Sequence, residues 1–202
     1  MTIHDRPGQI IILNGTPRSG KTSIAKEIQQ TFDGIWMNLG VDAMMRQTPE
    51  RYQPGIGLRP GGECPDLEPH IVRMYEAMFS MISVQSRLGF NVVVDVGFHE
   101  SYSQLLGILP KSARQLQGLP VVMIGIKCPL EEIMKRRRDT WGQTDERVPE
   151  PVKRWQAEVH KPGIYDLEVD TSKLSPVECA KVIHEYILSG KRASAMDQLR
   201  LR

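Results

Sequence analysis

Cysteine is scarce in this chain, and its thiols are not spaced as metal ligands or as disulfide partners. The three cysteines are far apart, odd in number and without a Cys-x-x-Cys pair. This pattern argues against a disulfide framework and against a zinc knuckle. The five histidines show no His-x-His or His-Glu-x-x-His spacing, so a metal site built on histidine is not expected either. We expect reduced, packed thiols at Cys64, Cys128 and Cys179.

Long apolar runs and a strong net charge are also missing. No stretch of about 18 uncharged apolar residues occurs, and the segment from Met1 to Arg6 lacks the apolar core of a signal peptide. The formal charge of +2 is small for 202 residues, so the charge balance alone suggests neither a nucleic-acid binder nor a protein for acidic substrates. We therefore expect a soluble cytoplasmic protein with no membrane partner and no nucleic-acid partner.

Strand-like and helix-like segments alternate along the chain, which is long enough for one α/β domain but short for two. Alternation of this kind indicates a parallel sheet with helices on its faces, and runs of β-branched residues suit strands that are covered on both sides. The sequence therefore predicts an α/β fold with five strands. The strands are expected at 9–14, 35–39, 91–96, 121–126 and 166–169, and the helices at 20–32, 69–88, 100–116, 129–139, 150–160 and 175–189.

The helix expected over 69–88 carries a methionine-rich apolar stripe. We interpret the stripe as core filler rather than as a ligand site, because unbranched methionine fills irregular gaps between packed elements. The stripe follows three- and four-residue steps through Ile71, Met74, Tyr75, Met78, Met81, Ile82 and Gln85.

The segment 47–66 is denied regular structure by its prolines and glycines. A long loop inside a compact domain is often functional, so this segment is a candidate binding loop. We assign 1–190 to a single domain and leave the basic tail 191–202, which is loose or helical by context, without a function. The interrupting residues are Pro49, Pro54, Gly55, Gly57, Pro60, Gly61, Gly62 and Pro65.

The most specific motif lies between the first expected strand and the first expected helix. It reads Gly-Thr-Pro-Arg-Ser-Gly-Lys-Thr and fits the phosphate-binding P-loop pattern at every fixed position. Its glycines let the backbone curl and point N–H groups at phosphates, and the helix that follows adds its positive dipole end. Lys21 would reach the β- and γ-phosphates, and the Thr22 hydroxyl would ligate Mg²⁺. The predicted nucleotide-binding residues here are Gly15, Thr16, Pro17, Arg18, Ser19, Gly20, Lys21, Thr22 and Ser23.

Two aspartates follow expected strands and are candidates for chemistry. Asp95 ends the 91–96 strand, where it could hold Mg²⁺ through water or cap a turn beside Gly97. Asp42 follows the 35–39 strand, where it could accept the proton of an attacking hydroxyl near the γ-phosphate. The residues alone equally allow Asp42 to be the N-cap of a helix over 43–47.

An arginine cluster forms the third candidate element. Consecutive helical residues point about 100° apart, so the three adjacent arginines at 136–138 cannot all face one phosphate. An arginine-rich segment that closes over a site can neutralise a transferring phosphoryl group. Some of these charges are expected to pair with acidic neighbours on a solvated helix face. We select Arg136 and Arg147 as the candidates.

Two function classes are compatible with a P-loop: a small-molecule kinase and a non-catalytic nucleotide-binding regulatory module such as a switch GTPase. A GTPase would normally show an Asn-Lys-x-Asp motif, and this chain has none. The arginine-rich segment favours the kinase class. His99, near Asp95, is either an acceptor-pocket residue or a capped or surface histidine.

Several segments together resemble the chloramphenicol phosphotransferase family over about residues 9–187. The P-loop belongs to a vast superfamily, but the Gly-Val-Asp and Tyr-Asp-x-Glu-Val-Asp-Thr segments are more specific. The similar segments are Ile-Ile-Leu-Asn-Gly at 11–15, Gly-Val-Asp at 40–42, Gly-Gly at 61–62, Val-Val-Asp at 93–95, Lys-Cys-Pro at 127–129, His-Lys-Pro-Gly-Ile-Tyr-Asp-Leu-Glu-Val-Asp-Thr at 160–171 and Glu-Cys-Ala at 178–180.

The resemblance implies a three-layer P-loop kinase fold with a central five-stranded parallel sheet and a short arginine-rich lid at about 136–150. It implies ATP- and Mg²⁺-dependent transfer of the γ-phosphoryl group to a hydroxyl of the antibiotic, and hence antibiotic resistance. It favours Asp42 as the base, places Arg136 in the lid, and puts Asp170 and Thr171 near the adenine. Arg147 matches the family pattern less closely.

Departures from the family pattern concern the acceptor. Where the family tends to show paired acidic residues after the third strand, this chain has Asp-Val-Gly-Phe-His at 95–99, and the loop 49–65 differs in length and character. Chloramphenicol or another small hydroxylated metabolite therefore remains open as the acceptor. Phosphorylation of a nucleoside monophosphate is the nearest enzymatic alternative.

Overall fold

A five-stranded, all-parallel sheet in the order β2-β3-β1-β4-β5 forms the centre of the structure, a computed structural model that describes residues 6–53, 59–141 and 147–202. The predicted α/β class and the predicted five-stranded parallel sheet are confirmed. Parallel strands end at a common edge, so the residues that follow β1, β2 and β3 are brought together there. The strands are β1 (Ile10–Asn14), β2 (Trp36–Gly40), β3 (Asn91–Val96), β4 (Val121–Lys127) and β5 (Leu167–Asp170).

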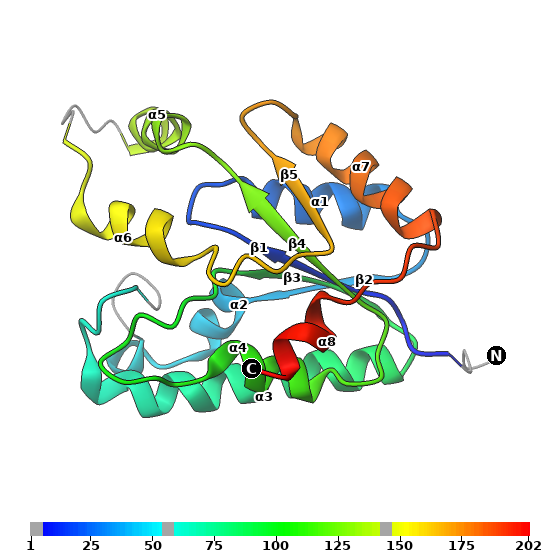
Figure 1. Ribbon diagram of the computed structural model, residues 1–202, viewed down its shortest axis with the longest axis horizontal. Helices are drawn as coiled ribbons and strands as arrows, with labels where there is room; N and C mark the ends of the chain where they lie inside the picture. The colour runs from blue at the N-terminus through cyan, green and yellow to red at the C-terminus, as the bar shows by residue number, and fades with distance from the viewer. Residues whose placement is uncertain (1–5, 54–58, 142–146) are drawn as a thin grey trace.

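Helices cover both faces of the sheet (Figure 1). One layer holds α1 (Lys21–Thr31) and α7 (Pro176–Leu188), and the other holds α3 (Glu68–Arg87), α4 (Ile108–Gln115) and α8 (Ala195–Arg200). Side chains alternate along β1, so Ile10 and Ile12 pack toward the α3 layer while Ile11 and Leu13 pack toward the α1 layer. This two-sided burial explains why β1 is apolar throughout.

In the α3 layer, one segment differs from the sequence-based expectation and another takes one of its two expected states. The helix predicted over 100–116 begins only at Ile108, because the Glu100 carboxylate accepts hydrogen bonds from the amides of Gly107 and Leu109 and holds the preceding chain as a loop. The tail forms the short helix α8, whose Ala195, Met196 and Leu199 are buried in the core. The tail was expected to be either loose or helical, and it is helical. Packing against the core stabilises this helix, although its sequence has only a weak helical pattern.

The remaining elements gather at the carboxyl edge of the sheet. Here lie α2 (Val41–Gln47), α5 (Leu130–Trp141) and α6 (Glu150–Glu158). The loop 47–66 contains the 3₁₀ turn Glu50–Tyr52 and the start of a second one, Pro65–Leu67, so the expectation of no regular structure is wrong for the residues of these turns that it covers. Residues 54–58 of this loop and 142–146 of the expected lid lie outside the described residues. Among the helices in the described ranges, none combines the length and apolarity that crossing a membrane requires.

Candidate active site

The P-loop joins β1 to α1, as its strand-loop-helix context predicts. Two of its residues adopt left-handed backbone conformations, Arg18 with φ 69° and Gly20 with φ 95°. A Cβ atom on Gly15 would lie 2.7 Å from the Ile126 carbonyl oxygen, so only glycine fits beside β4. The loop is thus shaped to present backbone N–H groups at the start of a helix, which is where anions bind.

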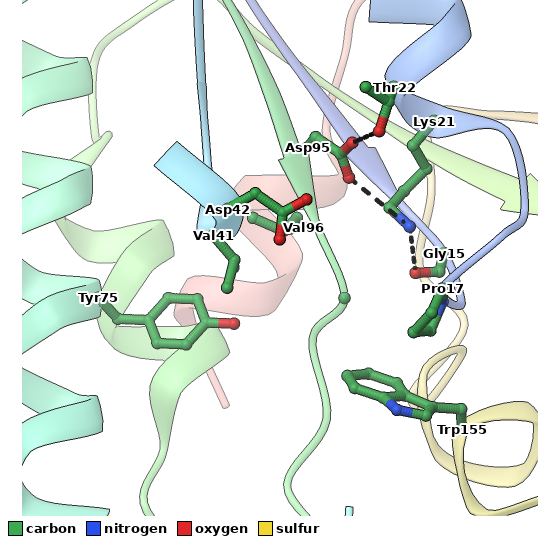
Figure 2. A pocket seen from close by; sticks show the side chains of 11 residues that line it. Gly15, Pro17, Lys21, Thr22, Val41, Asp42, Tyr75, Asp95, Val96 and Trp155 are labelled. Carbon is green, nitrogen blue, oxygen red and sulfur yellow. Dashed lines mark hydrogen bonds and ion pairs between the residues drawn. The ribbon is translucent and has the colours of Figure 1, made fainter. Parts of the chain in front are cut away.

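Lys21 lies folded over this loop and is almost completely buried. Its Nζ donates to the carbonyl oxygens of Gly15 at 2.9 Å and Thr16 at 2.8 Å, and it is 3.6 Å from Oδ1 of Asp95 (Figure 2). Burial lowers the pKa of Lys21, and the nearby Asp95 carboxylate opposes that shift. The ammonium group is therefore held inside the cradle by backbone oxygens and one carboxylate.

Asp95 and Thr22 lie side by side because β1 and β3 are neighbours in register. Leu13 pairs with Asp95, and the Thr22 hydroxyl donates to Oδ2 of Asp95 at 2.7 Å. A hydroxyl and a carboxylate are the hard oxygen ligands that Mg²⁺ prefers, and Mg²⁺ usually takes its other ligands from water and substrate phosphates. In the described part of the chain no group of three or more His, Cys, Asp or Glu side chains could form an all-protein cage. The pair fits a cation shared with a nucleotide.

Asp42 projects into the same space from α2. The helix begins at Val41 with Gly40 as its N-cap, so the alternative that Asp42 caps a helix from Ala43 is wrong. A Cβ on Gly40 would lie 2.5 Å from the Asp95 carbonyl oxygen, so this glycine lets β2 end close against β3. Figure 2 shows the exposed Asp42 carboxylate facing the space between Lys21 and Tyr75.

A single cavity of about 190 Å³ joins these groups. Its walls combine the P-loop and the two aspartates with aromatic and aliphatic side chains from α2, α3 and α6 (Figure 2). The cavity is large enough to take part of a small molecule beside the phosphate cradle. The lining residues are Gly15, Pro17, Lys21, Thr22, Val41, Asp42, Tyr75, Asp95, Val96, Gly97 and Trp155.

Two aromatic residues of this cavity were missed by sequence reasoning. Tyr75 belongs to the stripe interpreted as core filler, and it is buried in the core with Ile71, Met78 and Ile82, but it also lines the cavity. The signal for Tyr75 was its hydroxyl, a polar tip within an otherwise apolar stripe. Burial, and then the charge of Glu100, raise its pKa and so favour the neutral hydroxyl. Trp155 gave no sequence signal.

Arg136 contacts the P-loop from outside the cavity. Its guanidinium donates to the carbonyl oxygen of Thr171 at 2.6 Å and to that of Arg18 at 3.2 Å, while its Nε donates to Glu132 at 3.0 Å. The Thr171 hydroxyl donates to the Ser19 carbonyl oxygen at 2.7 Å. Arg136 and Thr171 thus connect α5, the end of β5 and the phosphate loop.

The other predicted residues are not among those that line the cavity. Arg147 is exposed just before α6, and Asp170 accepts hydrogen bonds from the hydroxyl and amide of Ser172, which lower the pKa of its carboxyl group. His99 is neither a lining residue of the described cavity nor a surface residue. It is buried, and its ring lies 4.3 Å from the Tyr102 ring at a tilt of 31°.

Known proteins resemble this chain in sequence and in fold. The family model described as chloramphenicol phosphotransferase-like protein matches residues 8–188. A candidate O-phosphotransferase of Mycobacterium tuberculosis, Rv2636, is 25% identical over 223 residues, which cover 96% of this chain and 89% of the relative.

Solved structures with the same fold come from proteins of low sequence identity. The Deinococcus radiodurans tunicamycin resistance protein aligns with a TM-score of 0.61 at 21% identity, over 89% of this chain and 95% of that one. The Mycobacterium tuberculosis APS kinase, solved with AMPPNP and APS, aligns with a TM-score of 0.59 at 13% identity, over 91% and 99%. At these identities the matches show a shared P-loop kinase fold.

Proposed function

Because this chain belongs to the chloramphenicol phosphotransferase-like family, we propose that it transfers the γ-phosphoryl group of ATP to a hydroxyl group of chloramphenicol or a similar small molecule. One observation carries the proposal: Asp42 lines the same cavity as Lys21, Thr22 and Asp95. A proton acceptor then faces the place where a phosphate chain would end. We expect the protein to be cytoplasmic, where ATP is available. Phosphorylation of an antibiotic hydroxyl would then confer resistance.

The donor half of the proposal rests on the P-loop. Its backbone N–H groups would hold the β-phosphate, and Lys21 would exchange its two carbonyl partners for β- and γ-phosphate oxygens. Thr22 would ligate Mg²⁺ directly, and Asp95 would hold it directly or through water. Bound Mg²⁺ would supply neutralisation of phosphate charge. Asp170 and Thr171, beyond the P-loop at the end of β5, would lie near the adenine.

The acceptor half rests on Asp42. Its carboxylate would take the proton of the acceptor hydroxyl while that oxygen forms a bond to the γ-phosphorus and the bond to the β-phosphate oxygen breaks, releasing ADP. Arg136 would keep the P-loop in place from behind, and Arg147 would add positive charge near the transferring group if the lid closes.

The cavity walls favour an uncharged acceptor over a nucleoside monophosphate. Among the described lining residues, Lys21 is the only lysine or arginine, and it is already assigned to the donor. A monophosphate acceptor would need further cations for its own phosphate. The walls instead offer Val41, Tyr75 and Trp155, which suit an apolar molecule with a hydroxyl group.

Phosphate transfer from ATP can be measured over a panel of hydroxylated acceptors, with chloramphenicol first and nucleoside monophosphates included. The proposal expects ADP formation to rise when a neutral acceptor is added, with a phosphorylated product detected by mass spectrometry. A folded protein that binds ATP and phosphorylates nothing in the panel would favour the regulatory module. Turnover with monophosphates alone would favour the nucleoside monophosphate kinase.

A further inference from the structure

Asn14, the last residue of β1, makes a set of buried side-chain hydrogen bonds that the proposed reaction leaves unexplained. Only 2% of the residue is exposed. Its Oδ1 accepts from the Phe98 amide at 2.8 Å, and its Nδ2 donates to the Val159 carbonyl oxygen at 2.9 Å and to the Tyr165 hydroxyl at 2.8 Å. One carboxamide thus connects three segments that are far apart in the sequence.

Each of these segments leads into a different wall of the cavity. Asn14 precedes Gly15 of the P-loop, Phe98 follows Gly97, and Val159 directly follows α6, which carries Trp155. The walls also meet closely, since a Cβ on Gly97 would lie 2.9 Å from the Trp155 ring and 3.2 Å from the Gly15 carbonyl oxygen. Asn14 therefore connects the acceptor walls to the phosphate cradle and helps to fix their relative position.

Tyr165 and His160 complete the network. Because Asn14 Nδ2 can only donate, the Tyr165 oxygen accepts that bond, and its O–H is left to donate to Nδ1 of His160, 2.8 Å away. This direction requires a neutral imidazole. Burial, and then the positive charge of Lys127, lower the pKa of His160 to about 4, which agrees with that requirement. The chain of bonds has one consistent direction, from Asn14 through Tyr165 to His160.

We propose that Asn14, Tyr165 and His160 form a positioning network that sets the acceptor walls, Gly97 and Trp155, against the phosphate cradle during phosphoryl transfer. This inference rests on the proposed function. It also gives a physical role to His160 and Tyr165, two residues of the 160–171 segment. The resemblance of that segment to the family implied no role for these two side chains. None of the three lines the cavity, so they act through the residues that they hold.

Replacement of Tyr165 by Phe tests the network with little change in shape. The substitution removes one hydroxyl, so the Asn14 amide loses a partner and the His160 Nδ1 loses its donor. We expect kcat for transfer to fall on the order of tenfold, because small misplacements of reacting groups slow transfer strongly. The KM for ATP should change less than about twofold, because the cradle itself keeps its contacts. Tyr186→Phe, on α7, is the matched control and should leave kcat unchanged.

Amide hydrogen exchange gives a readout that does not depend on any acceptor. The Phe98 amide donates to Asn14, so Tyr165→Phe should speed exchange over residues 96–99, while Tyr186→Phe should not. If the wild-type protein phosphorylates nothing but exchange at 96–99 still rises, the proposed function fails and the physical coupling stands. If Tyr165→Phe leaves both kcat and this exchange unchanged, the network is overturned. The network is also overturned if kcat falls only in proportion to a loss of folded protein.

Discussion

The two halves of the cavity are built in different ways. The phosphate cradle is one continuous segment, residues 15–22, whose glycines, lysine and threonine each occupy a fixed position on a strand-loop-helix unit. The acceptor half is assembled from α2, α3, α6 and the carboxyl end of β3, and each contributes one or two side chains. A local motif therefore determines the proposed donor site, whereas the proposed acceptor site depends on how distant elements pack. Proteins with this fold can therefore share the same donor chemistry and differ in the acceptor that they bind.

The largest effect is expected from the cradle. Lys21→Ala removes the only lysine or arginine among the described cavity residues, so turnover should fall on the order of 10³-fold because phosphate charge loses its preorganised partner. Lys26→Ala, an exposed lysine on the same helix, is the control and should retain wild-type turnover. Steady-state ADP formation measures both variants. Wild-type turnover in Lys21→Ala would contradict the assignment of the cradle.

A somewhat smaller effect is expected at the boundary between the halves. Asp42→Asn removes the proposed proton acceptor but keeps the size of the side chain, so turnover should fall on the order of 10²-fold. ATP affinity, measured by calorimetry, should stay nearly constant because Asp42 does not belong to the P-loop. Asp33→Asn, at an exposed position beyond α1, serves as the control. An unchanged rate in Asp42→Asn would exclude it as the base.

The proposed donor half could be predicted from the sequence because its information is local. The P-loop needed only its own residues and flanking elements, and the five strands followed from runs of apolar residues. The contact between Thr22 and Asp95 could not be derived in this way, because it depends on β1 and β3 being neighbours although β2 lies between them in sequence. Trp155 enters the cavity for a similar reason, since only tertiary packing brings α6 to the edge of the sheet.

Side-chain direction limited the remaining predictions. Tyr75 shares a helix face with buried Met78 and Ile82, and sequence spacing cannot tell that its hydroxyl end reaches a cavity. Helical spacing predicts that the arginines at 136–138 cannot all face one phosphate, but it does not predict the bonds of Arg136 to Arg18 and Thr171, which depend on the loop after β5. The function of such residues depends on partners that lie far away in the chain.

A smaller and more selective effect is expected within the acceptor half. Tyr75→Phe removes a hydroxyl from the cavity wall and keeps the ring, so the KM for a hydroxylated acceptor should rise roughly threefold to tenfold. The KM for ATP should be unchanged, because the donor is held by a separate segment. Initial rates at varied acceptor and varied ATP separate the two constants. If the KM for ATP rises as much as that for the acceptor, the division of the cavity into two halves is wrong.

The smallest effect concerns stability rather than rate, and it tests whether the link between the halves depends on a neutral His160. Since the folded pKa is about 4 and the unfolded value is about 6.5, the unfolded chain binds more protons between these values. The stability that neutral His160 contributes is therefore complete above about pH 6.5 and is lost as the pH falls toward 4. With allowance for its partial exposure, we expect His160 to account for about 1 kcal/mol of the unfolding free energy lost between pH 7 and 5.

Urea unfolding of the wild type and of His160→Gln at both pH values measures this difference, with His184→Gln on α7 as the control. Equal pH dependence in the wild type and His160→Gln would show that the histidine is not held neutral, and the hydrogen-bond direction inferred from Asn14 through Tyr165 would then be wrong.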